Sequence, residues 1–274
     1  TMQSLGEALM EIIKERYPSA LEKTMCEYSH EKFLQDQADR ENAEEGNLKG
    51  LDCRKCKNRG HISVVKDNEL VWRMCECMKV RKSLEQIEKS GLKSLLDECT
   101  FENYEATADW QKHALSLAQN YLEYGENMWL FFGGQSGSGK SHLCTAVCGE
   151  LLKRNNAVKY MMWDSESKAL KSLVNDAYEY QRRMDELKSV KVLYIDDFLK
   201  VQRGQQPTPA DINLAFEIIN HRDVKNLRTI ISTERSIDDI ISLDEALGGR
   251  INRRSRGYQM NIAYDKNKNF RLRK

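Results

Sequence analysis

The feature that most constrains this chain is a glycine-rich loop between two apolar segments, in the stretch WLFFGGQSGSGKSHL at residues 129–143. Gly134, Gly139, Lys140 and Ser141 match the spacing G-x-x-x-x-G-K-[ST], with a strand-like run before them and a helix-like run after them. Glycines let successive backbone N–H groups point into such a loop, and the helix N-terminus adds positive potential there. The sequence therefore predicts a phosphate-binding loop.

Each residue of this loop has an expected place around a nucleoside triphosphate. The residues expected to enclose it are Gly134, Gln135, Ser136, Gly137, Ser138, Gly139, Lys140, Ser141 and His142. We expect Lys140 to reach the β- and γ-phosphates of ATP, and the Ser141 hydroxyl to bind Mg²⁺. The alternative interpretation is an ordinary glycine-rich turn, which the flanking strand and helix patterns disfavour.

A second acidic element follows in KVLYIDDF, where an apolar strand ends in Asp196 and Asp197. The carboxyl end of such a strand should face the phosphates. We expect Asp196 to hold Mg²⁺ and Asp197 to polarise the attacking water, with slow turnover because many ATPases have the longer glutamate there. A solvated Asp-Asp turn is the alternative. A third strand ends in Ser232 and Thr233, whose hydroxyls are weaker candidates to sense the γ-phosphate.

Strand-like segments alternate with helical patterns from about residue 99 onward. The segments are residues 128–133, 157–163, 191–196, 228–233 and 258–262. This alternation predicts an α/β domain over residues 99–274, with a parallel five-stranded sheet covered by helices. Residues 1–98 are expected to form a smaller helical, zinc-binding N-terminal domain. It would begin with an amphipathic helix over residues 2–16, whose apolar face carries Leu5, Leu9, Ile12 and Ile13.

Four cysteines in the N-terminal part have the spacing of a metal site. They are Cys53, Cys56, Cys75 and Cys77, and the hairpin-like stretch HISVVKDNELVWRM lies between the pairs. Four thiolates on two turns match a tetrahedral structural Zn²⁺ site in a module of about residues 50–80, with Arg54, Lys55 and Lys57 offsetting their charge. Zinc binding of about 10–16 kcal/mol would decide whether so small a module folds. His61 is an alternative ligand, and free buried thiols are an alternative interpretation.

The overall charge is balanced, with 43 Lys and Arg against 42 Asp and Glu and a net charge of +1. Contact with nucleic acid would therefore depend on local patches, such as the basic stretch between Arg250 and Lys274. No segment approaches the ~18 apolar residues of a membrane helix, and the N-terminus lacks the order of a signal peptide. We expect a cytoplasmic protein that makes no membrane contact.

Residues 100–274 resemble the AAA+ ATPase domain of bacterial and phage helicase loaders of the DnaC/DnaI type, which are relatives of the IstB-like transposition helper ATPases. The resemblance is carried by CTFENY, GGQSGSGKSHL, VLYIDDF, TIISTER and LDEALGGRINRRS, in that order. It implies a P-loop NTPase fold without a separate lid, slow hydrolysis of ATP to ADP and phosphate stimulated by assembly or DNA, and self-association of the ATP-bound domain. Lys140 and Ser141 would be the Walker A pair, Asp196 and Asp197 the Walker B pair.

The resemblance also implies three further roles. Thr233, or Ser232, would be sensor 1. Arg250 in GGRI would be the finger that acts on the ATP of a neighbouring subunit, a role for which the nearby Arg253 and Arg254 compete. Arg271 in NFRLR would be the sensor 2 arginine, with Arg273 as its competitor.

Members of this family carry an extra helix after the second strand that helps to hold single-stranded DNA. The matching segment is SESKALKSLVNDAYEYQRRMDELKS, at residues 165–189. Its candidates for DNA contact are Lys168, Lys171, Tyr178, Tyr180, Arg182 and Arg183, with Lys200 and Arg203 as weaker ones. Cations near aromatic rings suit a single strand, because the bases stack on rings while the cations follow the backbone. An amphipathic cover for the sheet is the alternative interpretation.

The loader family often carries an N-terminal metal-binding module that docks on the replicative helicase, which favours a loader over an IstB-like protein. The resemblance therefore implies an ATP-dependent loader of the replicative hexameric DNA helicase onto single-stranded DNA. The alternatives are an IstB-like transposition helper ATPase, and a zinc-bearing adaptor for which ATP is only a bound switch.

Overall fold

The computed structural model describes residues 30–89, 93–173, 175–202 and 204–272. The amphipathic helix expected over residues 2–16, with Leu5, Leu9 and Ile12, lies outside these described residues, and so do Arg203 and Arg273. The chain forms two compact units, Thr1–Arg81 and Lys82–Lys274.

The first unit is built from one helix and a β-hairpin. Helix α3 (His30–Ala43) is followed by the antiparallel strands β1 (His61–Lys66) and β2 (Glu69–Met74), and α4 (Cys77–Lys89) begins at its end. Asp67 and Asn68 join the strands with φ of 51° and 63°, the left-handed conformation that two-residue hairpin turns require. The Asn42 side chain of α3 bonds both the N–H and the carbonyl of Ser63, which fixes α3 against β1.

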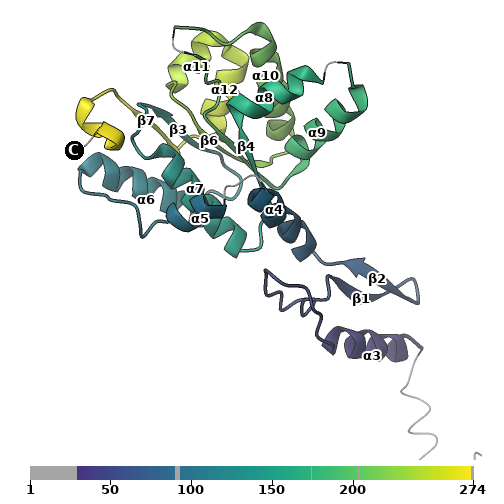
Figure 1. Ribbon diagram of the computed structural model, residues 1–274. Helices are drawn as coiled ribbons and strands as arrows, with labels where there is room; N and C mark the ends of the chain where they lie inside the picture. Colours follow the sequence, from purple (N-terminus) through teal and green to yellow (C-terminus); the bar gives the residue numbers. More distant parts are fainter. Residues whose placement is uncertain (1–29, 90–92, 174, 203, 273–274) are drawn as a thin grey trace, which may run out of the picture. The chain divides into compact units, whose positions relative to one another are not determined.

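The second unit contains the expected five-stranded parallel sheet (Figure 1). The strands are β3 (Leu130–Gly134), β4 (Val158–Met162), β5 (Val192–Asp196), β6 (Arg228–Ser232) and β7 (Gln259–Ile262). Their order across the sheet is β4-β5-β6-β3-β7, and every neighbouring pair is parallel. The carboxyl ends of β3, β5 and β6 consequently meet at one edge, where ligands bind in open α/β sheets.

Helices cover both faces of this sheet (Figure 1). One face carries α5 (Lys93–Glu98), α6 (Asp109–Tyr124) and α7 (Lys140–Lys153); the other carries α8 (Trp163–Ser172), α9 (Ala177–Ser189), α10 (Pro209–Val224), α11 (Ile237–Leu243) and α12 (Glu245–Arg254). Side chains alternate between the two faces along each strand, and those of Phe131, Leu193 and Ile231 point to the second of these faces. There they belong to one buried hydrophobic core. None of the described helices has both the length and the apolar composition needed to cross a membrane.

The sequence analysis predicted a single helix over residues 165–189, and this prediction is wrong. In the structure, α8 ends at Ser172 and a second helix, α9, begins at Ala177. The Asp176 side chain accepts a hydrogen bond of 3.0 Å from the Glu179 N–H and so caps a new helix. Aspartate favours such a cap because its short carboxylate reaches the free N–H groups of the first turn.

A buried arginine ties α9 and α10 to the sheet. The Arg222 guanidinium is fully buried and donates to the carbonyls of Leu187 at 2.8 Å, Val190 at 3.0 Å and Arg228 at 2.5 Å. Its Nε also donates to the Thr229 hydroxyl. Burial lowers the pKa of Arg222. The N–H groups of its planar guanidinium in turn satisfy backbone carbonyls at the end of α9 and at the start of β6.

We expect Arg222→Leu to lower the free energy of unfolding by about 3 kcal/mol, because it leaves several buried carbonyls without donors. Denaturant unfolding followed by circular dichroism measures the change. Lys225→Ala, in an exposed residue just beyond the same helix, is the control and should unfold at the wild-type midpoint. Equal stability of Arg222→Leu and the wild type would contradict this role.

Candidate nucleotide site and metal centre

The phosphate loop has a backbone that only glycine can adopt at its first position. Gly134, Gly137 and Gly139 have φ of 99°, 72° and 87°. A Cβ on Gly134 would lie 2.2 Å from the carbonyl oxygen of Ile262 on the neighbouring strand β7. Helix α7 begins directly after the loop, without an acidic residue in its first turn. The loop and the helix N-terminus therefore form a site for an anion.

Lys140 lies inside the loop that it is expected to serve. Its Nζ donates to the carbonyls of Gly134 at 2.9 Å and Gln135 at 2.6 Å, and its side chain is buried. Burial lowers the pKa of Lys140, while the nearby carboxylates of Glu234 and Asp197 act in the opposite direction. A phosphate entering the loop would offer this ammonium group stronger acceptors than the two carbonyls.

The segment after β7 is fastened to the same loop. The Asp265 N–H donates to the Gln135 side chain at 2.5 Å, and the Phe270 N–H donates to the Gly137 carbonyl at 2.9 Å. Two short 3₁₀ turns, η1 (Lys266–Lys268) and η2 (Phe270–Leu272), make up this segment. Arg271, the expected sensor 2 residue, follows the contact with Gly137 directly.

The Asp196 carboxylate accepts hydrogen bonds from four residues of the site. It accepts hydrogen bonds from the Ser141 hydroxyl at 2.8 Å, the Tyr160 hydroxyl at 2.9 Å, the Asp197 N–H at 3.1 Å and the Ser232 hydroxyl. The structure thus brings together Ser141 and Asp196, the two residues expected to hold Mg²⁺. Their oxygens are the hard ligands that this ion prefers.

Thr233 does not reach this carboxylate. Its hydroxyl is buried, donates to the Phe198 carbonyl at 2.7 Å and accepts from the Arg235 N–H at 3.1 Å. Thr233 therefore holds the loop after β5 in place. Ser232, the alternative for sensor 1, is the hydroxyl that contacts Asp196.

Asp197 faces a lysine. It has a left-handed backbone with φ of 53°, and its carboxylate lies 2.9 Å from the ammonium group of Lys200. Lys200 also lies 3.3 Å from the carboxylate of Glu234. Lys200, a weak candidate for DNA contact, is therefore ion-paired beside the nucleotide site. Glu234 was missed, although it directly follows the Ser-Thr end of the third predicted strand.

His142 joins the loop to the beginning of the domain. Its ring lies 2.8 Å from the Thr100 carbonyl through Nε2 and contacts the Tyr104 ring edge-on, with 5.3 Å between ring centroids. Within the described part of the chain, the buried Tyr104 hydroxyl has no hydrogen-bond partner, and the ring lies against Gly139. The CTFENY segment therefore forms one wall of the phosphate loop.

The three arginines that compete for the finger role surround one acid. The Asp223 carboxylate lies 3.8 Å from Arg250, 2.6 Å from Arg253 and 3.7 Å from Arg254. The Arg250 guanidinium also stacks on the Phe216 ring, and its side chain is 30% exposed. Arg253 is 66% exposed, and Arg254 is mostly buried. Of the three, Arg253 is thus the most accessible in the isolated chain.

The cations expected to touch DNA are paired with carboxylates. Lys168 lies 2.7 Å from Asp164, Lys171 lies 2.6 Å from Asp211, Arg182 lies 2.6 Å from Glu179, and Arg183 lies 3.0 Å from Glu179. The Tyr180 hydroxyl donates to Glu217. Tyr178 differs because its ring is 81% exposed. The partner of Lys171 also has a structural role, because Asp211 is buried and forms the capping box of α10.

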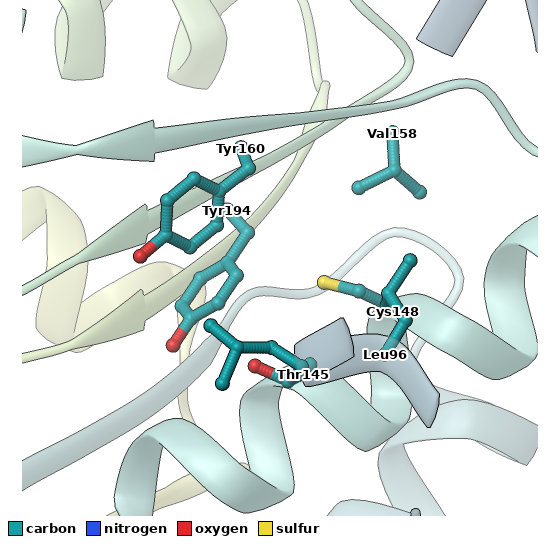
Figure 2. Close-up of a pocket in the computed structure, with 7 residues that line it drawn as sticks. Leu96, Thr145, Cys148, Val158, Tyr160 and Tyr194 are labelled. Atoms are coloured by element: carbon teal, nitrogen blue, oxygen red, sulfur yellow. The ribbon is translucent and has the colours of Figure 1, made fainter. Parts of the chain in front are cut away.

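A small apolar cavity lies beside Tyr160, whose hydroxyl donates to Asp196 (Figure 2). It holds about 20 Å³, and its lining includes Cys148 of α7, Leu96 of α5 and the rings of Tyr160 and Tyr194. The two rings meet edge-on, 5.2 Å apart. Burial, together with the negative charge of Asp196, raises the pKa of Tyr160, so that its hydroxyl keeps the proton that it donates. No sequence pattern singled out Tyr160.

We expect Tyr160→Phe to reduce ATP hydrolysis about tenfold and to raise the Mg²⁺ concentration needed for half-maximal rate. The reason is that a hydrogen bond to a charged group contributes about 1.5–3 kcal/mol. Magnesium titrations of the hydrolysis rate measure both. Tyr194→Phe is a matched control, because that hydroxyl lies 3.3 Å from Ser232 and does not touch the carboxylate. Wild-type magnesium dependence in Tyr160→Phe would refute the positioning role.

The first unit gathers the four cysteines of the predicted zinc site. The thiols of Cys53, Cys56, Cys75 and Cys77 are buried and lie within 4.8 Å of one another. The sulfurs of Cys53 and Cys75 are 3.8 Å apart, and those of Cys56 and Cys77 are 3.5 Å apart. Zn–S bonds of about 2.3 Å in a tetrahedron place the sulfurs ~3.8 Å apart. The four residues therefore fit Zn²⁺.

The structure separates the four cysteines from the alternative ligand. His61 packs against the Trp72 ring, 5.2 Å away, and is not part of the cluster. Arg81 of α4, which the sequence did not indicate, contacts Cys77 and bonds the Leu51 carbonyl at 2.6 Å. Burial raises the pKa of Cys75 and Cys77, whereas at Cys56 the Gly60 N–H and the neighbouring thiols outweigh burial and lower the pKa.

We expect one zinc ion per chain by elemental mass spectrometry. The double variant Cys56→Ser and Cys77→Ser should lose the ion and the protease resistance of residues 30–81, because structural zinc contributes about 10–16 kcal/mol in small modules. Cys99→Ser is the control, since Cys99 is a free cysteine outside the cluster. Zinc content of one per chain in the double variant would exclude the site.

Comparison with known proteins places this geometry in a family. The bacterial DnaA ATPase domain family matches residues 95–256. The chain is 30% identical to YqaM, an uncharacterized protein of Bacillus subtilis (strain 168), over 203 residues, which are 71% of this chain and only 64% of YqaM. It is also 30% identical to the replicative helicase loader DnaC of Escherichia coli (strain K12) over 182 residues, which are 65% of this chain and 70% of DnaC.

A crystal structure of the DnaC helicase loader has the same fold. It superposes with a TM-score of 0.51 and 19% sequence identity, over 61% of this chain and 97% of that chain. The phosphate loop, the parallel sheet and these matches lead to one assignment. The chain belongs to the AAA+ ATPases of the DnaC helicase-loader type.

Proposed function

We propose that the chain is an ATP-dependent loader that places the replicative hexameric DNA helicase on single-stranded DNA. The proposal rests on one observation above the others: the Ser141 hydroxyl and the Asp196 carboxylate meet 2.8 Å apart beside Lys140, in a chain related to a replicative helicase loader. The contact between Ser141 and Asp196 supports a step driven by ATP. The similarity to DnaC suggests that this step serves helicase loading.

The family implies that nucleotide and Mg²⁺ bind in the second unit. Ser141 and Asp196 are the residues that would hold Mg²⁺, which when bound neutralises negative charge on the β- and γ-phosphates. Lys140 would exchange its two carbonyl acceptors for phosphate oxygens. Arg271, next to the contact with Gly137, would approach the same phosphates from the segment after β7.

Hydrolysis would depend on assembly of subunits. An arginine correctly placed on a transferred phosphoryl group contributes roughly 10³–10⁵ in rate. In the isolated chain, the Asp223 carboxylate holds Arg250 and Arg253. On assembly, Arg250 or its neighbour Arg253 would exchange this acid for the γ-phosphate of an adjacent subunit, so that ATP promotes self-association and association promotes cleavage.

Single-stranded DNA would lie across α8 and α9. The exposed ring of Tyr178 offers a base a stacking surface. Lys168 and Arg182 keep much of their side chains exposed while paired with carboxylates, so phosphates could compete for them. Lys171 would contribute least, because Asp211 holds it.

The zinc module would bind the helicase. Its strand β2 exposes Trp72 and Met74, with 73% and 75% of their surface accessible. They lie on the same face of the strand because they are two residues apart. Exposed aromatic and methionine side chains are typical of protein interfaces.

The test measures helicase transfer to single-stranded DNA with the full chain, ATP and the replicative helicase of the same cell. We expect transfer by the wild type and none by Lys140→Ala, whose affinity for ATP should fall about 10- to 100-fold with the lost charge-assisted bonds. Lys153→Ala is the matched control, since Lys153 lies at the other end of α7 and pairs with Glu150.

Other outcomes would favour the other functions. Capture of a transposase and no helicase would indicate an IstB-like helper. Helicase binding that is the same in Lys140→Ala and the wild type, without phosphate release, would indicate a zinc-bearing adaptor with ATP as a bound switch. Absence of heat on titration of the wild type with ATP and Mg²⁺ would remove the basis of the loader proposal.

A further inference from the structure

Arg81 is a cation beside the cysteine cluster for which no role has yet been given. It lies four residues after Cys77 in the segment CMKVR of α4, so the two side chains share one face of the helix. Burial raises the pKa of the Cys77 thiol, and a hydrogen bond from Arg81 acts in the opposite direction. The guanidinium therefore lies next to one of the four sulfurs of the predicted zinc site.

The same guanidinium holds the segment that carries the first cysteine pair. Its Nη2 donates to the Leu51 carbonyl at 2.6 Å and to the Asn58 side-chain oxygen at 2.9 Å. That side-chain oxygen of Asn58 also accepts the Cys53 N–H at 2.9 Å. Arg81 consequently connects the segment around Cys53 with the helix that carries the last cysteine of the cluster.

Two lysines expected to offset the thiolate charge have other partners. Lys55 is exposed and pairs with Glu76 at 3.6 Å, and the exposed Lys57 donates to the Ala43 carbonyl at 2.8 Å. Arg81 differs because its Nε is buried and, among the residues that the structure describes, has no hydrogen-bond partner. A buried donor normally has an acceptor, and thiolates of the cluster are the acceptors closest in chemistry and position.

We infer that Arg81 is the positioning residue of the zinc site, which offsets the excess negative charge of the four thiolates and holds the two cysteine pairs together. Four thiolates carry more charge than one Zn²⁺ neutralises, and a fixed guanidinium beside them lowers the energy of this excess. Groups that support metal ligands in this way typically contribute about 10–100-fold to metal affinity. The inference rests on the predicted zinc site and is independent of the loader proposal.

The test measures the zinc affinity of the full chain by competition with a chelator of known affinity. We expect Arg81→Met to weaken zinc binding about 10- to 100-fold. Arg81→Lys should recover part of this loss, because lysine keeps the charge but lacks the planar fork that reaches Leu51 and Asn58 together. Lys57→Met is the matched control and should bind zinc as the wild type does, since Lys57 bonds the Ala43 carbonyl.

Cobalt in place of zinc separates an effect of charge from a loss of folding. Co²⁺ held by four thiolates has visible absorption bands typical of a tetrahedral site, and a charge-transfer band whose energy depends on how strongly the sulfur electrons are held. We expect Arg81→Met to keep the tetrahedral bands at saturating cobalt. Its charge-transfer band should move to longer wavelength, because removal of the cation raises the energy of the sulfur electrons.

Three results would overturn the inference. They are wild-type zinc affinity in Arg81→Met, a charge-transfer band at the wild-type wavelength in that variant, and equal or complete losses of metal binding in Arg81→Met and Arg81→Lys, which would show that the charge has no effect. A wild type that binds no zinc would refute the zinc site and this inference together. The loader proposal, which rests on the nucleotide site, would then still be judged by helicase transfer.

Discussion

The rest of the nucleotide site depends on how the negative charge of Asp196 is satisfied. This carboxylate ends β5 and receives hydroxyl groups from α7, β4 and β6, through Ser141, Tyr160 and Ser232. Charge-assisted hydrogen bonds are about twice as strong as neutral ones. Three separate elements are therefore held to one carboxylate. The hydrogen bond between Ser141 and Asp196 fixes the end of the phosphate loop against the sheet, and it also brings together the two side chains expected to hold Mg²⁺.

The strand order explains why so much polar chemistry is concentrated at this edge. Because β6 lies between β5 and β3, the residues that follow it reach both the acid strand and the phosphate loop. Ser232 turns to Asp196, Thr233 turns to the backbone after β5, and Glu234 turns to Ser136 and Lys200. Three consecutive residues thus support three different parts of the site, which a strand in a different position could not do.

The features that the sequence predicted are those encoded by residues close together along the chain. The spacing from Gly134 to Ser141 is enough to predict the phosphate loop, and two close cysteine pairs are enough to predict a metal cluster. Apolar runs likewise predicted the five strands. The contacts that were missed join distant segments: Tyr160 reaches Asp196 across 36 positions, and Arg81 reaches Leu51 across 30. Only the folded chain brings such groups together.

The break between α8 and α9 and the choice between Ser232 and Thr233 have a different cause. The sequence on both sides of Asp176 is typical of a helix. The free energy that its N-cap contributes is too small for the sequence to distinguish two helices from one continuous helix. Adjacent residues at a strand end point to opposite faces, so a shift of one position decides which hydroxyl meets the acid. Such alternatives are resolved by packing.

The fastening of residues 265–272 to the phosphate loop has a mechanical consequence. Two backbone N–H groups, those of Asp265 and Phe270, grip the loop at Gln135 and Gly137. A force that pulls this segment away would be transmitted to the backbone of the phosphate loop at Gln135 and Gly137. A molecule that displaces the segment would in this way change the shape of the phosphate loop without touching the loop itself.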